Sequence, residues 1–166
     1  MAIGRTASVG LTGIDGFIVQ VEAQVAKGLP AFSISGLGDS AVSEATDRIK
    51  AAFRHLELSV QQRAVVVNLS PASRRKVGSG YDLAIAVATL AGADIVPPWL
   101  VDGVVHLGEL GLDGTIRGVC GILPAVLAAQ RAGIRTVVVP AENASEAALA
   151  RDVHVVPVTH LRGVIE

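Results

Sequence analysis

One stretch of the chain, from 108 to 143, limits the possible folds more than any other. It starts with a short apolar strand that reaches Glu109, and the Asp-Gly pair at 113–114 predicts a reversal of the chain. An Ala- and Leu-rich helix is expected after Gly121, and a Val-rich strand follows it and ends at Pro140. Strand, turn, helix and strand in this order indicate a domain in which helices and strands share one core.

The chain before this stretch is predicted to be mostly strands. Two short strands, at 7–11 and 31–35, flank a longer one at 17–26, in which Phe, Val and Ala alternate with Gln and Glu. This alternation is typical of a strand with one buried and one wet face in an antiparallel sheet. A helix is expected from Asp39, which would cap it, to about Leu56. Its wet side would carry four charged residues, Asp47, Arg48, Lys50 and Arg54.

The middle and end of the chain continue the mixed pattern. A buried strand is predicted at 63–69, a polar loop at 70–80 and a second helix at 83–93, for which Asp82 would be the cap. The segment at 101–107 leads into the strand that ends at Glu109, and other short strands and helices follow the opening stretch. This irregular order favours an α+β, two-layer fold with a mixed sheet over a regular doubly wound one.

Composition fits one compact domain over residues 1–166. Half of the residues are hydrophobic but only 3% are aromatic, so the core must consist of Val, Leu, Ile and Ala. Charged residues make up 17% of the chain, which is low for an isolated soluble domain. Two explanations are compatible with this value: another domain or subunit covers some of the apolar surface, or the chain simply has a compact, well-buried α/β-type core.

Several classes of function are disfavoured by the sequence. The net charge of −1 shows no general preference for nucleic acid, and the single Cys120 excludes an internal disulfide and a Cys-based zinc site. No two of the four histidines have the spacing of a metal motif, and no Gly-Lys pair of a P-loop occurs, so we expect neither a metal nor ATP to bind this domain. Without a predicted membrane span or signal peptide, we expect a cytoplasmic protein with no membrane partner.

A set of short motifs spread over nearly the whole chain resembles one protein family. The chain is similar to the amino-terminal, ChlI-type domain of the ComM (YifB) group of magnesium-chelatase-like AAA+ proteins, and more distantly to the Lon peptidase domain. The motifs that carry the resemblance are Val9-Gly10-Leu11, Gly28-Leu29-Pro30, Gly36-Leu37-Gly38-Asp39, Asn68-Leu69-Ser70-Pro71-Ala72, Tyr81-Asp82-Leu83, Gly108-Glu109-Leu110, Arg131-Ala132-Gly133 and Pro140-Ala141-Glu142-Asn143. The family pattern departs from this sequence at Gly38, at 75–78 and at Ala84.

The resemblance implies a fold, a parent protein and partners. The fold would be like that of the second domain of ribosomal protein S5 and of the Lon peptidase domain. The chain would be excised from a longer protein in which an AAA+ domain binds ATP and Mg, and the partners would be that domain, further copies in a hexamer and DNA. The family implies DNA processing, in natural transformation and branch migration.

Comparison with the Lon pattern tests whether peptidase chemistry is retained. A Ser–Lys dyad needs a hydroxyl and a neutral amine within hydrogen-bond reach. The run at 76–82 matches the serine motif so that Gly80 falls at the nucleophile position, and Leu123 falls at the position of the catalytic lysine. Both dyad positions are degenerate, which predicts a domain that is not an enzyme. An active peptidase would have to use the neighbouring Ser79.

The loop before the second helix is the candidate for nucleic-acid contact. No acidic residue occurs between 58 and 81, whereas this segment contains four basic residues and one aromatic that a base can stack on, namely Arg63, Arg74, Arg75, Lys76 and Tyr81. A contact with a neighbouring subunit is equally compatible with these residues.

Three hypotheses follow from the sequence. The first is a non-catalytic assembly and nucleic-acid-contact domain of a ComM-type AAA+ protein. The second is a Lon-type serine peptidase that uses Ser79, and the third is a protein-interaction module that regulates a chelatase-like ATPase.

Overall fold

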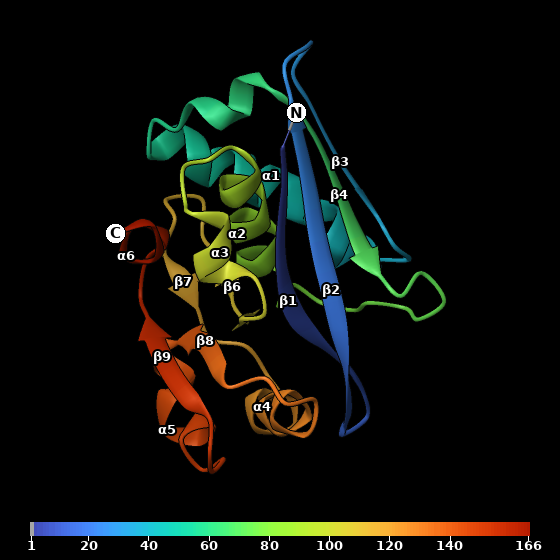
Figure 1. Ribbon diagram of the computed structural model, residues 1–166, viewed down its shortest axis with the longest axis vertical. Helices are drawn as coiled ribbons and strands as arrows, with labels where there is room; N and C mark the ends of the chain where they lie inside the picture. The colour runs from blue at the N-terminus through green and yellow to red at the C-terminus, as the bar shows by residue number, and fades with distance from the viewer. Residues whose placement is uncertain (1) are drawn as a thin grey trace.

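The computed structural model describes residues 2–166, except for the side chain of residue 61. A mixed seven-stranded sheet, in the order β3-β4-β2-β1-β5-β8-β9, runs through the molecule (Figure 1). Its strands are β1 (Ala2–Thr12), β2 (Asp15–Ala26), β3 (Ala31–Ser35), β4 (Ala64–Ser70), β5 (Val105–His106), β8 (Thr136–Pro140) and β9 (His154–Val158). The pairs β1–β2 and β2–β4 are antiparallel, whereas β3–β4, β1–β5, β5–β8 and β8–β9 are parallel.

A small two-stranded sheet and several helices surround the main sheet. The small sheet pairs β6 (Glu109–Leu110) with β7 (Ile116–Arg117). The helices are α1 (Ser40–His55), α2 (Asp82–Gly92), α3 (Pro98–Val101), α4 (Ile122–Arg131), α5 (Ala144–Ala147) and α6 (Leu161–Ile165), and 3-10 turns lie at Ser59–Gln62 and Ala141–Asn143. The predicted fold class, α+β with a mixed sheet, is confirmed.

The larger core lies between the sheet and the helices α1 and α2. The alternation predicted for β2 is present, since Val19, Val21, Ala23 and Val25 are buried on the side of these helices. Every residue of α2 is buried, which explains its composition of Ala, Leu, Ile and Val. A Cβ atom at Gly4 would lie 2.0 Å from the Ala88 carbonyl oxygen, so glycine is needed where β1 crosses α2.

A second, smaller core lies on the opposite face of the sheet. Buried residues of α4 and α5 pack there against β1, β5 and β8. Residues 6–10 of β1 are consequently buried on both faces. The position of α4, between the β1–β2 hairpin and β8, separates one side of the molecule into a cleft and an outer groove (Figure 1).

Some predicted elements need correction. The first strand is longer than predicted, because it pairs along its whole length with β2. The predicted strand ending at Glu109 is two strands in different sheets, since the chain turns at Gly108, where φ is 158°. None of the helices within the described residues is both long and apolar enough to cross a membrane.

Candidate functional site

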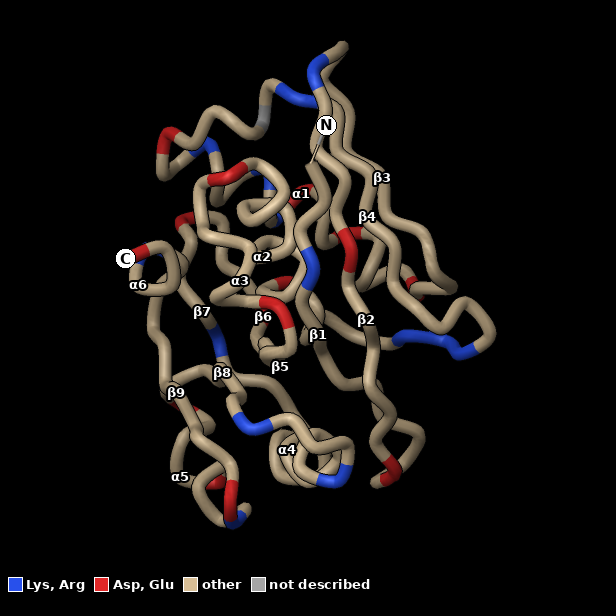
Figure 2. Tube along the Cα trace, viewed as in Figure 1, with Lys and Arg blue, Asp and Glu red and all other residues tan. Residues whose placement is uncertain are grey.

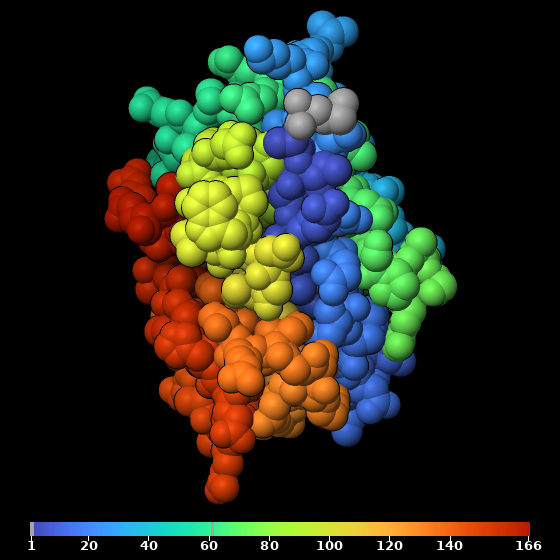
Figure 3. Space-filling model, in the orientation of Figure 1, coloured from blue at the N-terminus to red at the C-terminus, as the bar shows by residue number. Residues whose placement is uncertain are grey.

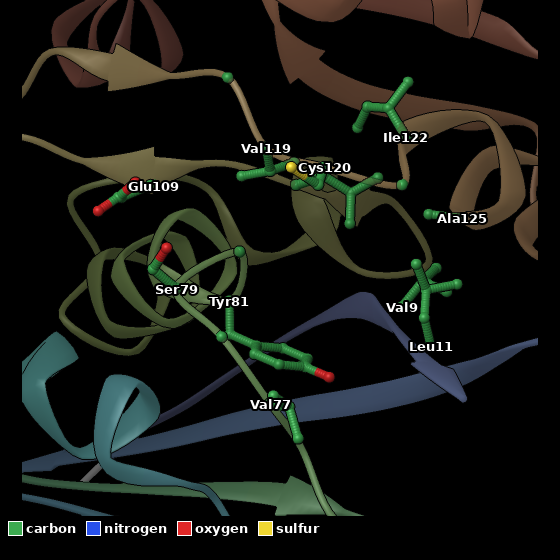
Figure 4. Close-up of a pocket in the computed structure, with 15 residues that line it drawn as sticks. Val9, Leu11, Val77, Ser79, Tyr81, Glu109, Val119, Cys120, Ile122 and Ala125 are labelled. Carbon is green, nitrogen blue, oxygen red and sulfur yellow. The ribbon is translucent and has the colours of Figure 1, made fainter. Parts of the chain in front are cut away.

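A cleft of about 450 Å³ opens between two loop segments and the end of β1. One wall is the segment 77–81, which precedes α2, and the other is the segment 118–122, which leads into α4. Val9 and Leu11 of β1 lie between them (Figure 4). The cleft is thus mainly apolar, with the polar groups of Ser79, Tyr81, Glu109 and Cys120 at its edges.

The second wall is held by its own turn and by the segment after β8. Gly121, the first position before α4, has φ of 78°, a left-handed conformation that glycine adopts without strain. The Asn143 side chain accepts from the Val119 N–H at 2.9 Å and donates to the Val119 carbonyl oxygen at 3.1 Å. These contacts fix Val119 and Cys120 along the cleft, and the Cys120 thiol is exposed.

The first wall is held by the loop that starts α1. Asp39 caps α1 as predicted, by accepting from the Val42 N–H at 2.9 Å. Its other oxygen accepts from the Gly78 N–H at 3.1 Å, and its backbone N–H donates to the Lys76 carbonyl oxygen at 3.0 Å. The capping residue therefore also positions the cleft wall.

Lys76 is not available for contact with nucleic acid. Its side chain is fully buried, and its ammonium group donates to the carbonyl oxygens of Gly36 and Pro71. Burial lowers the pKa of Lys76. The lysine thus joins the two loops in front of α1 and α2, and it correspondingly does not reach Ser79.

Tyr81 is also buried, contrary to its predicted role as a surface for base stacking. Only 3% of the residue is exposed, and burial raises its pKa to about 12, with a further contribution from the negative charge of Asp39. The ring lies along the base of the cleft (Figure 4). The phenol is therefore neutral at physiological pH.

Asp82 does not cap α2, which is a correction to the sequence analysis. Its buried carboxylate accepts from Arg48 Nε at 2.6 Å and Arg48 Nη2 at 2.9 Å, and from the Leu110 N–H at 3.0 Å. Burial raises the pKa of Asp82, and the hydrogen bonds from Arg48 and Leu110 oppose this. The bidentate geometry identifies an ionised pair, which in turn raises the pKa of Arg48.

Arg48 is the residue that sequence reasoning missed. Its helical position predicted a wet side chain, but only 17% of the side chain is exposed. It donates to the Ala41 carbonyl oxygen and to Asp82, and so connects α1, α2 and β6. The one available signal was that Asp82 is the only charged residue of the apolar helix α2, so that its carboxylate needs a partner when the helix is buried.

The remaining basic residues of the predicted nucleic-acid site are separated. Arg63 lies before the start of β4, whereas Arg74 and Arg75 are exposed in the loop beyond its end. Arg74 stacks 3.9 Å from the centroid of the Phe17 ring and donates to Thr12 Oγ1 at 3.1 Å. Figure 2 shows the basic stretch 74–76 beyond the end of β4, at the edge of the molecule. The structure thus reduces the predicted cluster to these two arginines.

The two degenerate dyad positions do not share a cavity. Gly80 lines the cleft, but Leu123 lines a separate groove on the outer side of α4. The Leu123 N–H points to Glu146 Oε1 at 3.3 Å. Of the two other lysines, Lys27 is exposed after β2 and Lys50 lines a small hollow beside β3. Among the described residues, no lysine lines the cleft that contains Ser79.

Charged groups also occur on the β6–β7 hairpin beside the cleft. Glu109 and Arg117 are directly opposite in the β6–β7 pair, but no salt bridge joins them in the described structure. Asp113 shapes the intervening turn by accepting from the Thr115 N–H at 3.0 Å. The Thr115 side chain and then this backbone hydrogen bond lower the pKa of the Asp113 carboxyl. Within residues 2–166, no three His, Cys, Asp or Glu side chains gather where they could hold a metal ion.

Comparisons with known proteins agree with this geometry. Residues 21–143 match the family model described as subunit ChlI of Mg-chelatase. An uncharacterised Mycobacterium tuberculosis protein is 44% identical over 155 residues, which cover 93% of this chain and 31% of the relative. The competence protein ComM of Haemophilus influenzae is 34% identical over 152 residues, which cover 92% of this chain and 30% of ComM.

A more distant similarity extends to peptidases. The Lon protease of Xanthomonas oryzae is 27% identical over 176 aligned positions, which cover 99% of this chain and 20% of that enzyme. The chain spans about a third of the length of the M. tuberculosis protein and of ComM. With a family match over most of its residues, the chain belongs to the family of the Mg-chelatase subunit ChlI, and its relatives include ComM.

Proposed function

We propose that this chain is a non-catalytic assembly and nucleic-acid-contact domain of a ComM-type, magnesium-chelatase-like AAA+ ATPase that takes part in DNA processing. The main support is the composition of the cleft. The nucleophile position is Gly80, and the only nearby ammonium group, that of Lys76, is bonded to two carbonyl oxygens outside the cleft. A Ser–Lys dyad requires both groups in one site.

The proposal includes a longer parent protein. The chain covers about a third of its ComM relative, which leaves length for an AAA+ domain that binds ATP and Mg and assembles into a hexamer. The relative's name, competence protein, supports a link to natural transformation. This part of the proposal is an inference from the family, because a fold does not determine function.

Contact with nucleic acid would rely on Arg74 and Arg75. Both are exposed, no acidic residue occurs between 58 and 81, and stacking on Phe17 orients the Arg74 guanidinium while leaving donors free for a phosphate. Two arginines form a small site, so we expect weak binding that depends strongly on salt.

Fluorescence anisotropy with labelled single- and double-stranded DNA tests this contact. With two phosphate contacts, the logarithm of the binding constant should fall with the logarithm of salt concentration with a slope of about −2. Removing one arginine, as Arg74→Ala or Arg75→Ala, should reduce the slope by about 1. Arg151→Ala is the control, because Arg151 is exposed just before β9, at the opposite edge of the sheet from β3 and β4.

Absence of binding at low salt, or binding that the double variant Arg74→Ala/Arg75→Ala leaves unchanged, would remove the nucleic-acid half of the proposal. An equal loss of DNA affinity in the Arg151→Ala control would show that the losses reflect only the total charge of the chain.

A peptidase that uses Ser79 is the second candidate, because this hydroxyl lies in the cleft. A hydroxyl needs an adjacent base to act as a nucleophile, and neither a lysine nor a histidine lines the cleft. A fluorophosphonate probe should therefore leave Ser79 unlabelled. Labelling that is lost in Ser79→Ala would favour the peptidase instead.

A further inference from the structure

An exposed apolar patch lies on the short helix α3. Trp99 is 77% exposed and Leu100 is 62% exposed, although both belong to residue types that are usually covered. Asp102, also exposed, follows directly after the helix. We call Trp99, Leu100 and Asp102 the α3 patch. Figure 3 shows the α3 segment at the surface, in yellow-green, next to the amino-terminal strand.

A groove of matching character lies between α4 and the β1–β2 hairpin. Its volume is about 420 Å³, and we call it the α4 groove; it is lined by Ile14, Asp15, Leu123, Pro124, Leu127 and Arg131. Leu123 and Leu127 are four positions apart and therefore lie on one side of the helix. Ile14, at the hairpin tip, is 80% exposed. The α4 atoms, in orange, and the hairpin, in blue, are neighbours in Figure 3.

Each surface offers one charge of opposite sign for the contact, since Asp102 belongs to the α3 patch and Arg131 lines the α4 groove. The segment 77–116, which includes α3, contains acidic residues and no Lys or Arg, whereas the segment 117–135, which includes α4, contains arginines and no Asp or Glu. Figure 2 shows this separation along the chain. Asp102 and Arg131 are both exposed, and neither forms a salt bridge with another described residue. The single acidic residue in the groove is Asp15, from the hairpin.

We propose that the α3 patch of one copy of this chain docks into the α4 groove of a second copy. The Trp99 ring would occupy the space between Ile14 and Leu127, where the Asp15 carboxylate can accept from the indole N–H. Asp102 would face Arg131 across the contact, so charge complementarity sets the orientation. Leu123, at the position where related peptidases would carry a lysine, would serve the contact as an apolar side chain.

This contact joins two different surfaces, so it can repeat head-to-tail. In such a chain each terminal copy keeps one unoccupied surface, and further copies add until a ring closes or a filament forms. The inference rests on the assembly half of the proposed function and identifies the surfaces that would carry it. Because both surfaces are small, the contact should be weak in the 166-residue chain and should appear as association that rises with concentration.

The single tryptophan provides a direct test. Trp99 is the only Trp in the chain, so its fluorescence should shift to the blue as concentration rises, in step with the mass measured by sedimentation. Leu127→Asp should weaken association by about tenfold or more, because it places a charge in the groove. Leu149→Asp is the matched control, since Leu149 is 70% exposed outside both surfaces and should leave association unchanged.

A charge-reversal pair sharpens the test. Asp102→Arg and Arg131→Asp should each weaken self-association by about tenfold or more, because like charges then face each other. An equal mixture of the two variants should recover association, because every contact between unlike copies again joins opposite charges. Arg54→Asp is the control for Arg131→Asp: Arg54 likewise lies in the last turn of a helix, so both changes disturb the helix dipole equally.

The outcomes separate this inference from the proposed function. A chain that stays monomeric but binds DNA through Arg74 and Arg75 would overturn the inference and leave the nucleic-acid contact standing. Association without DNA binding would support the inference and remove the nucleic-acid contact. Trp99 that becomes covered only when the chain continues into a following domain would show a different occupant, and would also overturn the inference.

Discussion

The two walls of the cleft are held by interactions of different range. In the stretch 108–123, the turn depends on Asp113 and Thr115, two positions apart, and on the conformation of Gly121. In the stretch 70–82, the Lys76 ammonium group, the Gly78 N–H and the Asp82 carboxylate each bond to a residue 34 to 40 positions away. The turn beside the second wall could thus be predicted from neighbouring residues, whereas these bonds of the first wall form only in the folded chain.

The buried charges beside the first wall show why this range matters. Asp82 has a counter-ion, Arg48, whereas Lys76 has only the dipoles of two carbonyl groups. A buried charge must be compensated, or its pKa shifts toward the neutral form. The pKa of Lys76 is lowered accordingly. Both groups appear in the sequence as ordinary charged residues of a polar loop and a helix start.

Breaking the Asp82–Arg48 pair should have the largest effect on stability. Asp82→Asn would leave the largely buried Arg48 guanidinium with only the distant, exposed carboxylate of Glu44, at an expected cost of about 3 kcal/mol in the free energy of unfolding. Urea denaturation followed by circular dichroism measures this loss. The substitution should also loosen the stretch that leads to the second wall, because Asp82 accepts from the Leu110 N–H of β6.

Glu44 supplies the matched control. It lies 3.9 Å from Arg48, but its side chain is 67% exposed, so Glu44→Gln should change stability by no more than about 0.5 kcal/mol. Replacing both members, as Arg48→Met/Asp82→Leu, should cost less than Asp82→Asn alone. Equal losses for Asp82→Asn and Glu44→Gln would show that long-range pairing does not hold this wall.

Titration of Tyr81, in the first wall, should change the stability of the protein by a smaller amount. Its pKa is raised to about 12 in the folded protein, against about 10 in the unfolded chain. Between these values the folded state holds one more proton, so stability falls as the pH rises, by up to about 2.7 kcal/mol. Because Tyr81 is the only tyrosine, phenolate absorbance follows it directly.

The comparison protein for this titration is Tyr81→Phe, which keeps the ring and removes the ionising group. The free energy of unfolding of Tyr81→Phe should not show the additional decrease between pH 10 and 12. A phenolate midpoint near 10 in the folded protein would show that the ring is open to water and that the first wall is looser than described.

These differences explain what the sequence could and could not predict. Alternation in β2, the Asp39 cap and the strand that ends at Pro140 follow from patterns within a few residues, and all are present. The exposed positions assigned to Arg48, Lys76 and Tyr81 were wrong, because each side chain is turned inward by a contact that forms only when α1, α2 and the loop before α2 pack together.

Placing residues in space also changed the meaning of the degenerate dyad. A linear comparison puts Gly80 and Leu123 at two positions of one active site, but the start of α4 directs Leu123 into the outer groove. Which of its first residues a helix turns toward the cleft, here Ile122 and not Leu123, depends on how the helix docks on the sheet. A sequence motif does not contain that information.

Gly80→Ser should have the smallest effect on stability, and it tests directly whether the two dyad positions lie in separate cavities. A Cβ atom at Gly80 would lie 3.8 Å from Val119 Cγ1, an ordinary contact, so stability should change by no more than about 0.5 kcal/mol. By contrast, Gly121→Ala would force a side chain into a left-handed conformation, at a cost of about 1–2 kcal/mol.

Even Gly80→Ser/Leu123→Lys should not react with a fluorophosphonate, because the new amine would lie outside the cleft and could not activate the hydroxyl. Labelling at residue 80 in that double variant, but not in Gly80→Ser alone, would show that the start of α4 can turn toward the cleft, and the two walls would then belong to one repairable active site.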